Sequence, residues 1–387
     1  MRTLAALLES SGGVAYLAER GVFADAHAFA ERLTPPARPE LATLLGVDPS
    51  APLVYLGQQA CADMASPTVA KFEAARDQVD PPAHVGVLWH DMDSTQSERF
   101  GARVVLPGAR RTRGVWLAPR ELEDRESRFI EVDRARLESA VHAIAEWARG
   151  ARPRDRPAVR ARLEILAGSL LEGDITTLAQ ANRALLSTLL REQLGFEAPA
   201  VFASEMVARG LLVASVEEYI ARIDEVVTVF NDALDRLVVD DIDPGVRPLG
   251  RDYLPLRYSC PHDGTRLRLE REGSGSSLRA TAACRCRRRY SFVLGDPPRL
   301  HELEATGRWS IDVSMPVHHN DLASGWVAGR STALYGMVFN EVLEKVLERR
   351  PLPILVPARL PPEDGGQDTL LVRYLTMERA RYDRAPA

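Results

Sequence analysis

The sequence has few cysteines, almost no lysine and no long uninterrupted run of apolar residues. Four cysteines in 387 residues are too few for a disulfide-rich secreted scaffold. No stretch approaches the ~20 apolar residues of a membrane-spanning helix. The N-terminal segment becomes acidic at Glu9 without a long apolar core before it, which argues against a secretory signal. We therefore expect a cytoplasmic protein with no membrane partner.

The charge balance excludes a surface built as a whole for nucleic acid. The chain carries 49 Lys+Arg against 54 Asp+Glu, a net charge of -5, so only a local basic patch could bind a polyanion. Only Lys71 and Lys345 are lysines, and the remaining positive charge is arginine. With 45% hydrophobic and 27% charged residues, the composition is typical of a globular protein. The length predicts two or three domains.

The apolar pattern predicts an α/β fold with a parallel sheet core that is split by a helical insertion and a small β insertion. Serine and proline at positions 66 and 67 are a typical helix start after the first strand. A strand, helix and strand pattern near the C-terminal end predicts a second parallel unit. The core strands are expected at 53–56, 85–89, 325–329 and 353–357, with a further strand at 102–106.

The material between the two halves of the core is of two kinds. Residues 120–240 are helical in pattern and include one expected long amphipathic helix over 216–239, which either packs on its own domain or pairs in a dimer. Residues 253–294 alternate in short runs typical of a β-ribbon, and 369–374 is expected to add a strand. The domains are therefore predicted as an N-terminal half core 1–118, a helical insertion 119–250, a zinc-ribbon-like module 251–296 and a C-terminal half core 297–387.

Polar clusters follow three of the predicted strands. Ligands of open parallel sheets bind at the carboxyl ends of the strands, where the strand order switches. The first cluster favours an anion such as phosphate or carboxylate, because glycine allows close approach, a helix N-terminus offers N–H groups and lysine adds charge; a structural turn is the alternative. It consists of Gly57, Gln58, Gln59, Ser66, Thr68 and Lys71.

The other two clusters could supply acid–base groups and further ligand contacts. His90, Asp91 and Asp93 directly follow an apolar strand, where an imidazole and carboxylates can bind a metal, transfer protons or hold an amino group; ordinary surface carboxylates are the alternative. The third cluster opens the last long helix and follows the polar stretch 318–321. It consists of Gly329, Arg330, Ser331 and Thr332.

Three blocks carry a family resemblance: Leu53–Ala75 (LVYLGQQACADMASPTVAKFEAA), Val85–Leu106 (VGVLWHDMDSTQSERFGARVVL) and Trp309–Val356. Together they resemble the cysteine ligases of bacillithiol synthesis, which add cysteine to glucosaminyl-malate. The resemblance implies a Rossmann-like core related to class I aminoacyl-tRNA synthetases. It also implies an amide-forming reaction between an amino acid and an amine acceptor such as an amino sugar conjugate. It further implies activation by ATP or another nucleotide, through an acyl-adenylate or an acyl-phosphate.

The resemblance also implies roles for the polar clusters. Residues of the first and third clusters would bind the nucleotide and the amino acid. Asp91, Asp93, His90 and Lys71 would be the catalytic set, with one of the aspartates as the base. The family has Glu-Asp-His-Asp where this chain has His-Asp-Met-Asp at 90–93, and Gly-Pro-Gly-Glu at 329–332. A second hypothesis is therefore an inactive or repurposed relative that binds a protein or nucleic-acid partner.

Three of the four cysteines lie within a span of 27 positions in the expected β-ribbon. Cys260 opens a Cys-Pro-His-Asp-Gly segment. After 19 further residues comes Cys284, and Cys286 lies two positions later. The Cys-Pro-x-x-Gly pattern is typical of a zinc-ribbon knuckle, and a structural zinc needs four ligands. We expect the three cysteines with either His262 or Asp263; reduced cysteines without metal are the alternative. The neighbouring run of Arg285 and 287–289 could meet a carrier protein or RNA, although a solvated charge run is the simpler interpretation.

Overall fold

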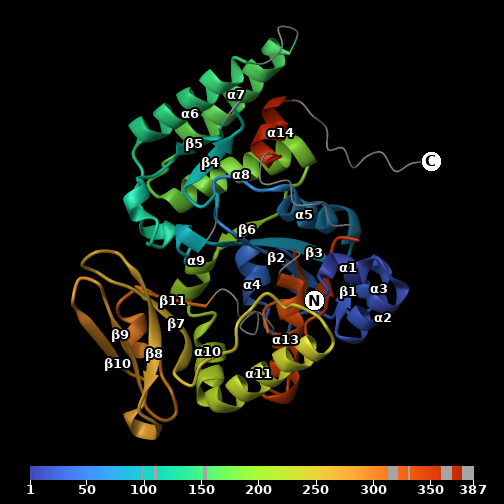
Figure 1. The fold of residues 1–387 in the computed structure, drawn as a ribbon, viewed down its shortest axis with the longest axis vertical. Coiled ribbons are helices and arrows are strands. Elements are labelled where there is room, and N and C mark those ends of the chain that lie inside the picture. The colour runs from blue at the N-terminus through green and yellow to red at the C-terminus, as the bar shows by residue number, and fades with distance from the viewer. Residues whose placement is uncertain are drawn as a thin grey trace. The chain divides into compact units, whose positions relative to one another are not determined.

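The computed structural model describes residues 1–97, 99–108, 111–150, 155–312, 321–329, 332–358 and 368–376. The chain divides into two compact units (Figure 1). The first unit contains Met1–Gln58, Ala70–Met92 and Ala198–Leu360, and the second contains Gln59–Val69, Asp93–Glu197 and Pro361–Ala387. Among the described residues, no helix has both the length and the apolar character that crossing a membrane requires.

The first unit is built on a six-stranded parallel sheet, which confirms the predicted fold class. Its strand order is β1-β13-β12-β2-β3-β6. The central strands are apolar on both faces, as expected of a parallel sheet covered by helices. The strands are β1 (Val22–Phe23), β2 (Leu53–Gln59), β3 (His84–His90), β6 (Ala200–Phe202), β12 (Gly325–Val327) and β13 (Ile354–Leu355).

Helices connect and cover these strands. The predicted helix after the first strand is α5 (Ser66–Gln78). Near the C-terminal end, α13 (Thr332–Lys345) joins the parallel strands β12 and β13, which confirms the strand, helix and strand pattern predicted there. A Cβ atom added at Gly336 would lie 2.7 Å from Ile354 Cδ1, so glycine allows α13 to approach the sheet closely. The short helices of the N-terminal segment and its neighbours are α1 (Leu4–Leu8), α2 (Ser11–Glu19), α3 (Ala26–Ala30), α4 (Glu40–Leu45) and α9 (Ala203–Ala208).

The prediction of a single long helix over 216–239 is wrong, because the chain forms two helices there, α10 (Val213–Ala221) and α11 (Ile223–Val239). Arg222 between them has φ -112 and ψ 24, outside the helical range. Apolar residues keep a spacing of three to four across the break, so the sequence pattern does not register it. As expected, α11 packs within its own unit: it lies beside α13 (Figure 1), with the ring centroids of Phe230 and Phe339 5.3 Å apart.

The predicted β-ribbon is present as an antiparallel sheet in the first unit, with the order β10-β9-β8-β7-β11 (Figure 1). Its last strand comes from beyond the boundary expected at 296, because β11 pairs with β7. The short helix α12 (His301–Glu304) precedes β11. The strands are β7 (Tyr253–Ser259), β8 (Arg266–Glu272), β9 (Arg279–Ala283), β10 (Arg289–Val293) and β11 (Trp309–Ile311).

The second unit is mainly helical, and it differs from the sequence-based expectation for two strands. The strand expected at 102–106 forms β4 (Arg103–Leu106), which pairs with β5 (Arg113–Trp116) in an antiparallel hairpin and does not join the parallel sheet. The strand expected at 369–374 is instead helix α14 (Leu370–Thr376), because Thr369 Oγ1 accepts from Val372 N at 3.3 Å and caps it. The other helices are α6 (Arg134–Ala148), α7 (Arg156–Leu171) and α8 (Leu178–Leu194).

Candidate functional site

The parallel sheet has its switch point between β2 and β12. The chain leaves β2 through α5 toward β3 on one side, and leaves β12 through α13 toward β13 on the other. Open α/β sheets bind ligands outside the carboxyl ends of the strands at this point. The carboxyl end of β2 carries Gly57 and Gln58, and Gly329 follows β12. The sheet therefore brings together residues of the first and third polar clusters.

Lys71 reaches this switch point from the second turn of α5. Its Nζ donates to the carbonyl oxygen of Gly57 at 2.7 Å, and the residue is 6% exposed. A Cβ atom added at Gly329 would lie 3.9 Å from Lys71 Cδ, so the aliphatic part of the lysine runs close to that loop. The loop is closed by Gly329 N, which donates to Thr332 Oγ1 at 2.8 Å. A buried cation thus lies at the point where the two halves of the sheet diverge.

His90 ends β3 beside the same glycine. A Cβ atom added at Gly57 would lie 3.1 Å from His90 Nε2, so the absence of a side chain gives the imidazole its place. Gln58 is buried at 7% exposure. The polar groups gathered at this end of the sheet, a histidine, a lysine and a glutamine, can hold an anionic ligand and transfer a proton.

Asp91 follows β3 but is held by a helix end. Its carboxylate accepts from the backbone N–H of Ser204 at 3.0 Å and from the Ser204 hydroxyl. Ser204 lies in the first turn of α9, where N–H groups lack partners within the helix. Asp91 is 2% exposed. The geometry gives this predicted catalytic carboxylate a role in capping α9.

Four members of the predicted crevice, Gln59, Ser66, Thr68 and Asp93, belong to the second unit. Asp93 accepts from Ser94 N at 2.8 Å and from the Gln59 side-chain amide. Ser66 Oγ donates to the Asp368 carbonyl oxygen at 3.0 Å and accepts from Arg373. Thr68 lies in the first turn of α5, and its backbone N–H donates to the carbonyl oxygen of Ala65. Arg330, Ser331 and 318–320 lie outside the described residues.

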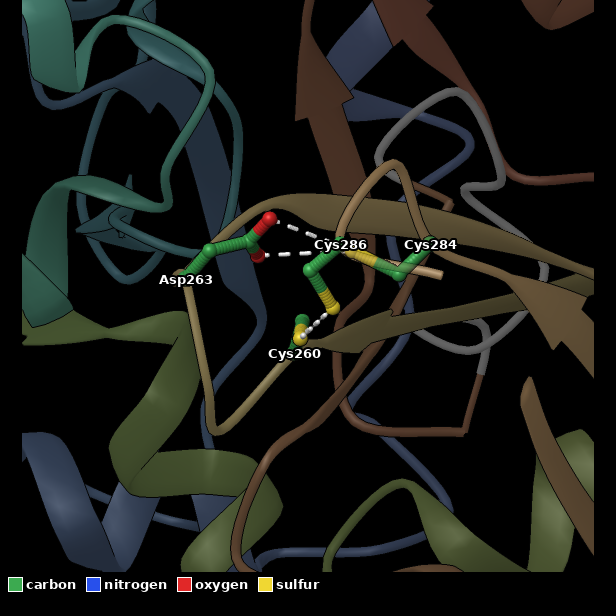
Figure 2. Close-up of side chains that lie close together, drawn as sticks. All are labelled: Cys260, Asp263, Cys284 and Cys286. Carbon is green, nitrogen blue, oxygen red and sulfur yellow. Dashed lines mark hydrogen bonds between the residues drawn. The ribbon is translucent and has the colours of Figure 1, made fainter. Parts of the chain in front are cut away.

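The predicted metal ligands do converge. Cys260, Asp263, Cys284 and Cys286 each offer a ligand atom, and these atoms lie within 4.8 Å of one another (Figure 2), so the group could hold a metal ion. Cys260 Sγ lies 3.8 Å from Cys286 Sγ, and Cys284 Sγ lies 3.3 Å from Asp263 Oδ2. Of the two expected alternatives for the fourth ligand, Asp263 belongs to the group and His262 does not. The side chain of His262 is exposed.

Two tight turns build this group. In the first, Gly264 N donates to the Cys260 carbonyl oxygen at 2.9 Å, and Gly264 has a φ of 78 that favours glycine. In the second, Arg287 N donates to the Cys284 carbonyl oxygen at 2.9 Å, and Arg287 itself has a φ of 69. The two turns follow β7 and β9 at the same end of the sheet, and their labelled side chains point toward one another (Figure 2).

The thiols of the group differ in acidity. Burial raises the pKa of Cys284 to about 12. Burial also acts to raise the pKa of Cys260, but hydrogen bonds from Tyr290 and from the backbone amides of Asp263 and His262 outweigh it and hold that pKa below its ordinary value. Tyr290 Oη lies 3.0 Å from Cys260 Sγ. A bound cation would favour the deprotonated form of all three thiols.

Reasoning from the sequence did not find the residues that hydrogen-bond to the predicted site residues and hold them in place. Ser204, Asp368 and Arg373 lie far along the chain from Asp91 and Ser66, and no motif connects them. Tyr290 follows the arginine run at 287–289 and lies on β10, next to the second turn. This closeness in sequence to Cys286 was the one signal that could have placed Tyr290 beside the cysteine group. The lone Cys61 is buried, as a small apolar thiol is expected to be.

Comparison with known proteins does not assign the chain to a family. The sequence matches no protein-family model, and no curated protein sequence matches it significantly.

Proposed function

We propose that the protein is a nucleotide-dependent ligase that joins the carboxylate of an amino acid to an amine. One observation supports this function above the others: buried Lys71, with its Nζ 2.7 Å from the Gly57 carbonyl oxygen, lies at the switch point of a parallel sheet. A buried ammonium at the ligand-binding edge of such a sheet suits a phosphate or carboxylate group. The resemblance of the strand-end blocks to cysteine ligases agrees with this chemistry.

Amide formation from a free carboxylate needs activation. Transfer of the carboxylate to a nucleotide phosphoryl group releases pyrophosphate or a nucleoside diphosphate and makes the carbonyl carbon electrophilic. The amine then attacks that carbon, loses a proton, and expels the nucleoside monophosphate or phosphate. Lys71 would stabilise the negative charge on the phosphoryl oxygens. His90 would accept the proton, because Asp91 is held by Ser204.

The substrates follow from the resemblance alone. Cysteine is the amino acid and an amino sugar conjugate is the acceptor. The assay incubates the protein with cysteine, glucosaminyl-malate and ATP and follows the coupled product by mass spectrometry. Lys71→Met is expected to abolish product formation. Lys345→Met is the matched control, because Lys345 is the only other lysine of the chain and pairs with Glu341 on the exposed face of α13.

A second candidate function is a binding module without catalysis. Asp91 and Ser66 support it, because both use their side chains to hold other parts of their own unit: Ser204 in one case, Asp368 and Arg373 in the other. The arginines at 285 and 287–289 are exposed and would contact an acidic protein or nucleic acid. Folded Lys71→Met protein that keeps full affinity for such a partner, with no turnover in the wild type, would favour this candidate.

We also propose that the four-residue group binds a structural zinc ion. Zn–S bonds of about 2.3 Å give a sulfur–sulfur edge of about 3.8 Å in a tetrahedron. Cys260 and Cys286 show this separation, 3.8 Å. Three thiolates and one carboxylate fill the four positions, and a site with four protein ligands is typical of structural zinc. The ion would join the two turns of the antiparallel sheet.

Metal analysis with thiol titration tests the zinc proposal. About one zinc per chain is expected, with the three cysteines unreactive until a chelator is added. Cys61 is the internal control, because it is buried in the other unit and does not belong to the group. A protein without metal whose three cysteines react freely in the native state contradicts the zinc site.

A further inference from the structure

A cavity in the first unit lies apart from the switch point and from the cysteine group. It has a volume of about 240 Å³ and lies between the strands β7 and β8, the helices α11 and α13, and the segment 246–250. Neither Lys71 nor any of the four clustered metal-ligand candidates lines it.

Arginines converge on this cavity. Arg257 on β7 and Arg268 on β8 are direct partners in the antiparallel register, so their side chains lie on the same face of the sheet. Arg247 lines the cavity from the connecting segment. Among the described lining residues Asp312 is the single acidic one, so three guanidinium groups face one carboxylate. Like charges directly opposite in a sheet are destabilising, and an anion between them removes the repulsion.

Arg257 is the central group of the set. Its side chain is 24% exposed, and its Nη2 lies 3.3 Å from Asp312 Oδ2. Its Nε is buried and has no hydrogen-bond partner among the described residues. Burial lowers the pKa of Arg257 in spite of Asp312, and Arg266 and Arg268 act in the same direction. A buried N–H without an acceptor costs free energy that a bound oxygen atom would recover.

Three aromatic side chains form another part of the cavity wall. Phe230 and Phe339 pack with their ring centroids 5.3 Å apart, and both line the cavity together with buried Tyr253. Arg268 lies over the Tyr253 ring, with its Cζ 5.7 Å from the ring centroid. Guanidinium groups beside aromatic rings suit a ligand with an oxyanion on an apolar body.

We propose that this cavity binds a small organic oxyanion, a carboxylate or a phosphate monoester, between Arg257 and Arg268. The volume excludes a whole nucleotide with its triphosphate, so the site is separate from the nucleotide site proposed at the switch point. Arg257 supplies a fixed, half-buried guanidinium, and Arg268 and Arg247 complete the charge from the exposed side.

Calorimetric titration of the full chain with phenyl phosphate and with benzoate tests this site. At least one of the two probes is expected to bind with a stoichiometry of one. Arg268→Gln is expected to weaken binding about 10- to 100-fold, the usual effect of losing a hydrogen bond from a charged group. Arg279→Gln is the matched control, because Arg279 lies on β9 of the same sheet and does not line the cavity. Binding of phenyl phosphate alone identifies a phosphate ester, and binding of benzoate alone a carboxylate.

The variants also separate this site from the switch point and from a purely structural role. Binding that persists in Lys71→Met and is lost in Arg268→Gln supports the cavity. Binding that follows Lys71 alone contradicts it and leaves the proposed ligase function intact. Without ligand, Arg268→Gln is expected to be at least as stable to thermal unfolding as the wild type, because it removes a like-charge pair. A less stable variant with unchanged probe binding, or no binding of either probe to the wild type, overturns the inference.

Discussion

Asp63 offers a quantitative test of how the second unit holds its C-terminal helix. The residue is fully buried, and its Oδ1 accepts from the N–H of Met64 at 2.8 Å and from the N–H of Leu371 at 3.0 Å. It therefore ties α14 to the segment that precedes α5. Burial raises the pKa of Asp63 from 3.8 to about 6, although hydrogen bonds from Thr369, Leu371 and Met64 oppose the shift.

The sign of the pH effect follows from this raised pKa. The folded state binds the Asp63 proton more tightly than the unfolded state, so the contribution to stability is complete below about pH 4 and is lost as the pH rises through about 6. Between about pH 4.5 and 7.5 the loss amounts to about 2 kcal/mol for this one group. Asp63→Asn keeps the oxygen that accepts from Met64 and Leu371 and cannot ionise.

Urea unfolding of the wild type and Asp63→Asn across that pH range measures the effect. The difference in unfolding free energy between the two proteins is expected to shift by about 2 kcal/mol in favour of the variant as the pH rises. Taking this difference cancels the titration of the other carboxylates, which the two proteins share. A difference that stays constant with pH, or that moves toward the wild type, refutes a buried carboxyl group with a raised pKa.

Three further predictions concern packing, capping and metal. Gly336→Ala is expected to lower the unfolding free energy by about 1–3 kcal/mol, because the added Cβ would lie 2.7 Å from Ile354 Cδ1; a neutral result in denaturant titration contradicts the close approach of α13 to the sheet. Asp91→Ala is expected to cost about 1 kcal/mol by uncapping α9, and Asp91→Asn less, because it keeps an acceptor for Ser204 N; equal losses in thermal unfolding speak against the cap. Removal of zinc by a chelator is expected to increase hydrogen exchange in β7–β10, while exchange in α8 of the other unit stays unchanged; uniform exchange in both states excludes a structural ion.

The parallel core could be predicted because its strands are buried on both faces. Runs such as 53–56 and 85–89 are continuous in apolar residues, and a serine–proline pair marks the start of α5. The three cysteines were also predictable, because local turns place them directly after the strands β7 and β9. Signals of this kind are local in the sequence.

The errors arise where tertiary contacts decide between patterns that the sequence leaves equivalent. The apolar spacing over 216–239 continues through the break at Arg222, and the residues 369–374 satisfy both a strand and a helix pattern until Thr369 caps α14. The choice of Asp263 over His262 depends on which side chain of a tight turn faces the sulfurs. The partners of Asp91 and Ser66 are 113 and more than 300 positions away along the chain, beyond any local signal.

Nucleotide binding tests the central proposal most directly. Calorimetric titration of the full chain with ATP and magnesium is expected to give one site per chain in the wild type and in Lys345→Met. Lys71→Met should stay folded by circular dichroism and lose that site. A wild-type protein that binds neither ATP nor cysteine, or a Lys71→Met variant that binds ATP as the wild type does, contradicts a nucleotide-dependent ligase with its crevice at the switch point of the sheet.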